Sequence, residues 1–353
     1  GLALLPALGL DGLQGLGGSL ILVAGEFDAI QHVHVLLDSP RNGVLRAIAL
    51  EAGDTTPEPW VPGDVASYAT WRWNVEVTYG ELSRLVDSFQ SEGAVSRWIK
   101  QRLSEPLGVD FEQDLLAAAD GRMTYLTWFE RPVRLNSQTQ LIAIKLKDSA
   151  EFKKTLEKMV DKYSDRFEKA SFGGVNFHKV KVPEGGERPR GRFGVQRGEN
   201  GNETRVQMNL RAPDPCFGIL GDYLVAADSV ALLQHCIVTQ SDAEKSLANE
   251  LDFKLIAGKI ARQVGGESPA LVTFNRPEEG IRMLYDLAMS DNTRGALASR
   301  AADNPFFKSV DQALKDNPLP PFAVIARYLA PGGGMLTNDE TGFHFTTFGV
   351  RRK

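Results

Sequence analysis

The chain has 353 residues, 42% of them hydrophobic and 24% charged, which is typical of a folded globular protein. This length exceeds one compact core of usual size, so we expect two domains or two halves of a repeat. Forty Lys and Arg residues stand against 45 Asp and Glu residues, and the net charge of −5 argues against a field that attracts nucleic acid or an anionic membrane. No apolar run in the sequence approaches the roughly 18 residues of a membrane span.

The first expected strand carries two histidines. In QHVHVLL, His32 and His34 are two residues apart and therefore lie on one face of a strand, where two imidazoles can share a metal ion. A third ligand at useful spacing is absent nearby in the sequence. Half-exposed strand histidines opposite the core are the alternative, and we predict no metal site.

Strand-to-helix units recur along the chain. Each consists of a short β-rich run, a polar turn and an amphipathic helix, and their weak similarity indicates an old duplication. The units are SYATWRWNVEV with TYGELSRLVDSF, TQLIAIKL with KDSAEFKKTLEKMVDKY, and PALVTFN with RPEEGIRMLYDLAMS.

The strand of the first unit is rich in tryptophan. Trp71 and Trp73 share one face of this strand, and Trp60 and Trp98 flank the region. Indole rings on one sheet face can form a surface for a sugar or a lipid. Packing beneath the following helix is the alternative, because aromatic residues at strand spacing are core residues by default. We keep Trp71 and Trp73 as a candidate ligand surface.

An acidic segment follows the first unit. GVDFEQD presents Asp110, Glu112 and Asp114 in the alternating order that opens a calcium-binding EF-hand loop. Such a loop also needs a central glycine and a glutamate at its twelfth position, and Leu115 and Gly121 stand there instead. An acidic helix N-terminus, which the helix dipole favours, explains the three acids.

Glycine-bearing turns join pairs of expected strands. FEKASF and VNFHKVKV flank Gly173-Gly174, CFGIL and YLVAAD flank Gly221-Asp222, and FAVIARYLA and GFHFTTFGV flank PGGGMLTNDET. Hairpins build antiparallel sheets, so we predict an α+β fold with antiparallel sheets and amphipathic helices packed on one face. The polar stretch 131–138 predicts a boundary between two related halves, residues 1–135 and 136–353.

A long glycine- and arginine-rich loop is expected at residues 184–204. Arg188, Arg190, Arg192 and Phe193, with Arg197 and Arg205 nearby, have the composition of a contact for single-stranded nucleic acid or another polyanion. Four glutamates of the same segment cancel most of that charge, and no nucleotide-binding P-loop motif is present. We predict a hairpin loop without nucleic-acid binding and keep Arg188, Arg190, Arg192 and Phe193 as a candidate partner surface.

Cys216 and Cys236 are the two cysteines of the chain. The first opens an expected hairpin and the second lies on the helix after it, so a single disulfide is compatible with this arrangement and would contribute about 3 kcal/mol by loop closure. Two buried thiols are the alternative. Two cysteines are too few for a zinc site of four close ligands.

Catalytic motifs are missing from the sequence. It lacks Gly-x-Ser-x-Gly, Ser-x-x-Lys and His-Glu-x-x-His, and Cys236 beside His235 cannot serve as a nucleophile and base because helix neighbours project about 100° apart. We predict no catalytic residues, no cofactor and no metal, although a site built from carboxylates would leave little trace in sequence.

Four segments, in their order along the chain, resemble a family of bacterial exported proteins classed as a domain of unknown function. They are LGVDFEQDLLAAADGRMTYLTW, QLIAIKLKDSAEFKKTLEKMV, FGGVNFHKV and FGILGDYLVAADSVALLQHCI, and the resemblance covers roughly residues 60 to 350. It implies a periplasmic or other cell-envelope location, with a signal or anchor upstream of Gly1 that would give the one route to membrane association. It offers no catalytic residues to carry over.

Three functions remain open at this point. The first is a non-catalytic exported binding or protein-interaction module, which predicts a groove between sheet and helices lined by apolar residues. The second is a carrier of a lipid or other small hydrophobic ligand, which needs a cavity. The third is a carboxylate-dependent hydrolase, which predicts a polar cleft with two acids of raised pKa.

Overall fold

The structure is a computed structural model that describes residues 8–182, 210–263, 268–290 and 304–351. It also describes the short pieces 196–197, 203–204, 294–295, 297 and 301.

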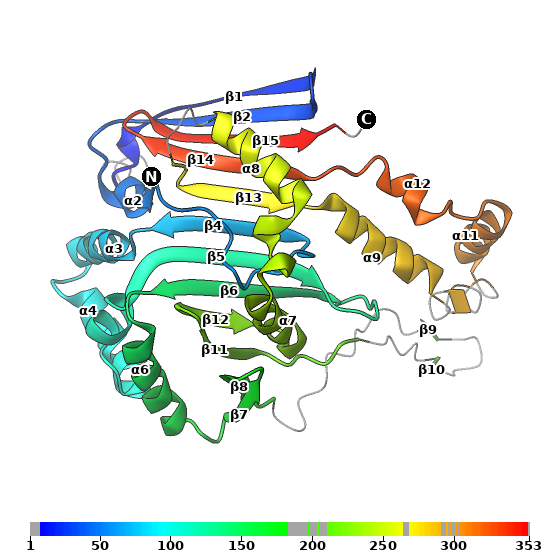
Figure 1. Ribbon diagram of the computed structural model, residues 1–353. Helices are drawn as coiled ribbons and strands as arrows, with labels where there is room; N and C mark the ends of the chain where they lie inside the picture. The colour runs from blue at the N-terminus through cyan, green and yellow to red at the C-terminus, as the bar shows by residue number, and fades with distance from the viewer. Residues whose placement is uncertain are drawn as a thin grey trace.

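One antiparallel sheet of thirteen strands organises the described residues (Figure 1). Its order is β1-β2-β15-β14-β13-β4-β5-β6-β12-β11-β8-β7, and β3 pairs with β4 outside this path. The strands are β1 (Leu13–Ala24), β2 (Phe27–Leu37), β3 (Leu50–Glu51), β4 (Ser67–Trp73), β5 (Ala119–Phe129), β6 (Gln138–Leu146), β7 (Phe167–Phe172), β8 (Val175–Val180), β11 (Cys216–Leu220), β12 (Tyr223–Ala227), β13 (Leu271–Asn275), β14 (Gly332–Asp339) and β15 (Gly342–Val350). A separate pair consists of β9 (Gln196–Arg197) and β10 (Glu203–Thr204).

The helices lie on both faces of the sheet and beyond one end of its strands. They are α2 (Gly43–Ala47), α3 (Val75–Phe89), α4 (Ala94–Ile99), α5 (Glu105–Leu107), α6 (Ser149–Lys162), α7 (Val230–Ser241), α8 (Leu251–Gln263), α9 (Pro277–Met289), α11 (Pro305–Asp316) and α12 (Phe322–Ala326). Short helical turns are η1 (Leu10–Gly12), η2 (Lys100–Ser104), η3 (Phe111–Leu116), η4 (Ala243–Lys245) and η5 (Leu247–Asn249).

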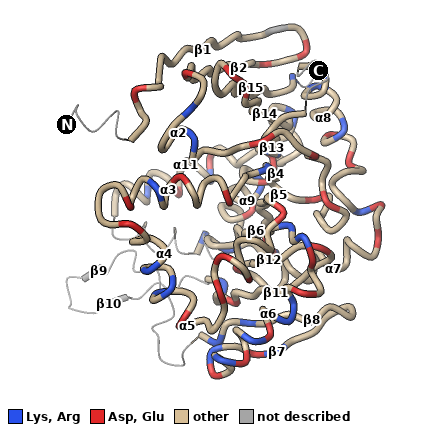
Figure 2. The backbone as a smooth tube through the Cα atoms, turned by 90° about the vertical axis from the view of Figure 1, so that its left-hand side faces the viewer, with Lys and Arg blue, Asp and Glu red and all other residues tan. Residues whose placement is uncertain are grey.

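We call the face covered by α7 and α8 the front face, and the opposite one the back face. On β12, Tyr223 and Val225 belong to the main core beneath α7 and α8, whereas Leu224 packs in a separate cluster with Phe152 and Leu156 of α6. Successive side chains of a strand point to opposite faces, so α6 must lie on the back. Figure 2 likewise shows α3 and α8 on opposite sides of the sheet.

The predicted α+β class with antiparallel hairpins is confirmed, with two differences. Helices cover both faces rather than one, because apolar residues occupy both sides of the central strands and each side has to be covered. The duplication is not confirmed. Strands from the two ends of the chain are neighbours in the sheet, since β2 pairs with β15 and β4 with β13. The expected boundary at residue 135 lies between β5 and β6, which pair with each other.

The expected strand at FAVIARYLA is wrong. Phe322–Ala326 form helix α12, and the glycine-rich segment expected to be a turn is itself strand β14. A Cβ atom at Gly333 would overlap the side chain of Ile256 on α8, so glycine is needed where this helix approaches the strand. Helices α9, α11 and α12 form a long connection between β13 and β14 and extend past the ends of the strands (Figure 1).

The segment between β3 and β4, residues 52–66, is called the strap. Its residues Trp60, Val61 and Val65 belong to the main core, and the backbone of Val61 accepts a hydrogen bond from Leu247 N at 2.9 Å. The strap therefore lies on the front face, next to the chain that enters α8.

Candidate functional site

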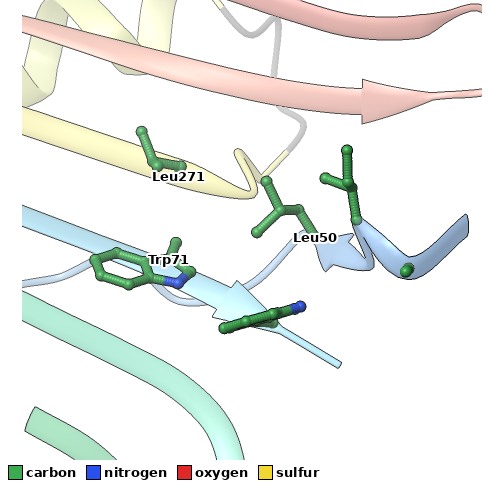
Figure 3. Close-up of a pocket in the computed structure, with 6 residues that line it drawn as sticks. Leu50, Trp71 and Leu271 are labelled. Atoms are coloured by element: carbon green, nitrogen blue, oxygen red, sulfur yellow. The ribbon is translucent and has the colours of Figure 1, made fainter. Parts of the chain in front are cut away.

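An apolar pocket lies on the back face where β13 begins, and we call it the aromatic pocket. Its volume is about 380 Å³. Trp71 and Trp73 of β4 line it together with Leu271 of β13, and residues 47–50 complete the wall with Ala47, Ile48 and Leu50. Figure 3 shows Leu50, Trp71 and Leu271 around the open space. All six lining side chains are apolar or aromatic, so the pocket suits an apolar group.

Strand pairing explains why a pocket forms at this point. β13 pairs with β4 only from Leu271 opposite Trp71 onward, and β3 takes its place beside β4 with Leu50 opposite Trp73. The sheet neighbour of β4 thus changes from one chain segment to another at Trp71–Trp73. The junction leaves space between Leu271 and Leu50, which α2 borders through Ala47.

The two indole rings differ in their hydrogen bonding. Trp73 donates from Nε1 to Thr78 Oγ1 at 2.7 Å, and Thr78 donates in turn to the carbonyl of Ala47 at 2.6 Å. This chain ties β4, α3 and α2 together and fixes the ring of Trp73 before any ligand arrives. The Nε1 of Trp71 has no hydrogen-bond partner among the described residues, so it is available to an acceptor on a ligand.

Charged side chains next to the pocket belong to other pairs. Arg72 lies between the two tryptophans on β4 and points to the opposite face. It donates to Asp120 Oδ1 at 3.0 Å and lies 3.9 Å from Glu51. The pocket lining therefore carries no charge of its own.

A buried polar cluster lies on the front face beneath the strap. Glu58 is 3% exposed and accepts hydrogen bonds from Tyr68 OH at 3.2 Å and from Thr124 Oγ1, while Arg122 Nε lies 3.2 Å from it. Burial first, and then the charge of Glu58, raise the pKa of Tyr68 well above its usual value. The cluster has no access for a substrate, and we assign it to holding the strap.

The hydrolase hypothesis required a cleft with two acids of raised pKa. The acid that reaches the surface near this cluster is Asp54, whose side chain is 67% exposed. Burial opposes ionisation of Asp54, but hydrogen bonds from Thr56 and the charge of Arg122 outweigh it and lower the pKa. A carboxyl group with a lowered pKa is a poor general acid at neutral pH.

The histidines of β2 meet a third imidazole. His32 Nδ1 lies 3.1 Å from Thr346 Oγ1, and the ring of His34 stacks on His344 of β15 with the centroids 3.8 Å apart. His344 lies beside His34 because β15 pairs with β2, two strands from opposite ends of the chain. The spacing of residues in the sequence did not indicate this contact. In the part of the chain that the structure describes, no cluster of three or more His, Cys, Asp or Glu residues is arranged to hold a metal ion.

The acidic segment at residues 110–114 caps a helical turn. Asp110 is the N-cap of η3 and accepts a hydrogen bond from Gln113 N at 2.9 Å, and Asp114 accepts one from Asp110 N at 2.8 Å. These contacts are those of an acidic helix N-terminus.

The structure has Cys216 and Cys236 as free thiols in the main core, which is the second of the two alternatives. Cys216 Sγ lies 3.7 Å from the carbonyl oxygen of Ser229. Burial raises the pKa of Cys216 to about 12 and also raises the pKa of Cys236 strongly. Neither thiol is suited to nucleophilic chemistry at neutral pH.

The candidate partner surface Arg188, Arg190, Arg192 and Phe193 lies outside the described residues, so the loop remains a prediction. Along the described chain, basic and acidic residues are interspersed (Figure 2). None of the helices within the described ranges has the length and apolar character needed to cross a membrane.

Sequence reasoning found two of the six residues of the aromatic pocket. It missed the apolar residues of 47–50 and Leu271, because they are ordinary apolar residues with no motif. Their only sequence signal is that Leu271 stands near the start of an expected strand.

Comparison of the chain with family models, with curated proteins and with solved structures found no match. The resemblance described for residues 60 to 350 thus stays an expectation.

Proposed function

We propose that the protein is a non-catalytic binding protein that holds a small apolar group in the aromatic pocket. The observation that carries this proposal is the placement of Trp71 and Trp73 in an open pocket lined only by apolar side chains. Residues of a helix and of the sheet contribute together to this pocket, since Ala47 of α2 lines it with the two tryptophans of β4.

The size of the pocket limits what it can hold. A volume of about 380 Å³ is near the lower end of the roughly 300–1,000 Å³ found for small-molecule sites. One aromatic ring system or a short acyl chain fits this space, whereas a complete two-chain lipid does not. The Nε1 of Trp71, which has no hydrogen-bond partner within the described ranges, favours a ligand with a hydrogen-bond acceptor beside its apolar part.

The affinity of this pocket alone should be modest. Burial of about 150 Å² of apolar ligand surface is worth roughly 4 kcal/mol, and association costs of several kcal/mol oppose it. Tight binding would need further contacts from the same partner outside the pocket. This favours recognition of an apolar group on a larger molecule, and we place that encounter in the cell envelope on the strength of the resemblance.

A fluorescence titration tests the proposal. The probe is N-phenyl-1-naphthylamine, an uncharged aromatic compound that emits strongly in apolar surroundings and quenches nearby tryptophans by energy transfer. We expect Trp71→Ala to weaken binding of this probe roughly tenfold, because an aromatic wall of the pocket is lost. Leu50→Asp should weaken it as well, by placing a charge in the apolar wall.

Trp98→Ala is the matched control, because Trp98 lies on α4, is 59% exposed and does not line the pocket. Its probe affinity should equal that of the unchanged protein. Equal affinities in Trp71→Ala and the unchanged protein, or equal losses in Trp71→Ala and Trp98→Ala, would overturn the proposal. Thermal melting of each variant establishes that it is folded before titration.

A further inference from the structure

A second cavity lies on the front face, and we call it the front cleft. Its volume is about 520 Å³. Its walls are strap residues 53–57, one face of α8 and residues around the start of β13. The front cleft and the aromatic pocket share no lining residue, although Leu271 and Val272 are chain neighbours on opposite faces of β13.

Small side chains on α8 create this space. The helix presents Phe253, Ala257, Ile260 and Ala261 to the cleft, at the spacing of one helical face. Phe253 and Ile260 belong to the main core and Ala257 packs against it, and the short side chains of Ala257 and Ala261 leave room in the cleft. The α8 side of the cleft, Lys254 apart, is therefore apolar, whereas Thr55, Thr56 and Ser268 add hydroxyl-bearing residues to the rest of its lining.

Two acids in and beside the cleft, Asp54 and Asp252, pair with arginines. Asp54 is held by Arg122, whose Nη1 donates to Asp54 Oδ2 at 2.8 Å, and the same guanidinium also pairs with the buried Glu58. Asp252, in the first turn of α8, accepts two hydrogen bonds from Arg276, of 2.6 and 2.8 Å. Lys254 lines the cleft, and among the ion pairs of the described residues none involves it.

The hydrogen bonding of Lys254 supports the same conclusion. Its ammonium donates to Asn249 Oδ1 at 3.3 Å, a long contact with a neutral acceptor. An ammonium group has three donors, so at least one remains for a ligand. The front cleft thus offers an ammonium donor beside the apolar side chains of α8.

We propose that the front cleft is a second binding site, for a small amphiphile with an apolar body and a single anionic head group that Lys254 recognises. The alanines of α8 accept the apolar body, and the Lys254 ammonium pairs with a carboxylate or sulfonate. This site is independent of the aromatic pocket, because the two lie on opposite faces and differ in charge.

A pair of probes with the same ring skeleton isolates the role of the head group. They are 1-anilinonaphthalene-8-sulfonate, which is anionic, and N-phenyl-1-naphthylamine, which lacks the sulfonate. Titrated with the full chain, Lys254→Ala should weaken binding of the anionic probe about fivefold, the value of one partly exposed ion pair, and leave the neutral probe unchanged. Lys254→Arg should retain the affinity for the anionic probe, and added salt should lower it.

Two further variants give the position of the site. Ala261→Trp fills the cleft and should remove this component of anionic-probe binding, whereas Arg262→Ala, on the same helix but outside the cleft, should keep it. Probe bound elsewhere on the surface is the same in all variants and does not affect the comparison. If Ala261→Trp fails to fold, the comparison of Lys254→Ala with Lys254→Arg still tests the inference.

Anionic-probe affinity that is identical in Lys254→Ala and the unchanged protein would overturn this inference. So would loss of that binding in Trp71→Ala together with normal binding in Ala261→Trp. The aromatic-pocket proposal is tested by a different measurement, the affinity of the neutral probe for Trp71→Ala, so the two proposals can fail separately.

Discussion

The buried pair of Glu58 and Arg122 offers a direct test of how the strap is held. We consider Glu58→Leu and Arg122→Met, singly and together, since these replacements fill the space with apolar atoms. In the unchanged protein Glu58 is 3% and Arg122 is 7% exposed, and their closest charged atoms are 3.2 Å apart. Both side chains are thus removed from water, and each depends on the other.

The expected loss of stability follows from the polar groups that each replacement leaves without a partner. Glu58→Leu leaves Arg122 Nε, Tyr68 OH and Thr124 Oγ1 without this acceptor, and we expect a loss of about 3–5 kcal/mol in the free energy of unfolding. Arg122→Met leaves a buried carboxylate without its counter-charge, and we expect the same loss of about 3–5 kcal/mol in the free energy of unfolding. The double variant contains neither charge and should lose clearly less than the sum of the two single losses.

Urea unfolding followed by circular dichroism gives the free energy of each variant and closes the double-mutant cycle. Asp54→Asn is the control, because Asp54 also pairs with Arg122 but is 67% exposed, so its loss should stay at or below about 1 kcal/mol. Strictly additive losses in the double variant, or a cost for Glu58→Leu no greater than that for Asp54→Asn, would refute the reasoning.

Three more predictions concern packing, pH and the thiols. Gly333→Ala should lower the free energy of unfolding by about 1–3 kcal/mol, because the added methyl group overlaps Ile256. Gly349→Ala is the control, since its methyl group meets nothing within 4 Å and should be tolerated. Equal shifts of the urea midpoint in the two variants would contradict this prediction. Burial alone would raise the pKa of Asp64, but hydrogen bonds from His235 and Trp128 lower it below its usual 3.8. Asp64 therefore stabilises the fold above that value and loses this effect as pH falls through the lower folded-state pKa. Below about pH 4, the free energy of unfolding of Asp64→Asn should thus depend less steeply on pH than that of the unchanged protein. Parallel curves of this free energy against pH would count against the prediction. Iodoacetamide at pH 8 should modify both Cys216 and Cys236 in unfolded, unreduced protein and neither in native protein, because both are buried with raised pKa; a mass that shows no alkylation after unfolding would indicate a disulfide.

The sequence by itself determined the local elements of this protein. Periodicity predicted a strand and a helix in each unit, but Val75–Val77, expected at the end of the first strand, belong to α3. The helix begins there because the side chain of Asn74 accepts a hydrogen bond from Val77 N at 3.0 Å. Gly173 and Gly174 predicted a hairpin, and both have positive φ angles, of 55° and 81°. These features depend on residues within a few positions of one another, so a single stretch of sequence carries the information.

Tertiary structure decided which strands are neighbours, and with them both candidate sites. Alternation assigns Trp71 and Trp73 to one face of β4, but nothing local brings Leu271 to the same pocket from the far end of the chain. Glu58 and Arg122 likewise read as ordinary charged residues until the strap places one over the other. The glycine-rich segment Gly332–Gly334 looked locally like a turn but forms a strand, because α8 approaches Gly333 closely and residues of the neighbouring strands approach Gly332 and Gly334. Pairing and packing energies come from contacts between distant residues, and a pattern within one segment carries no record of its partner.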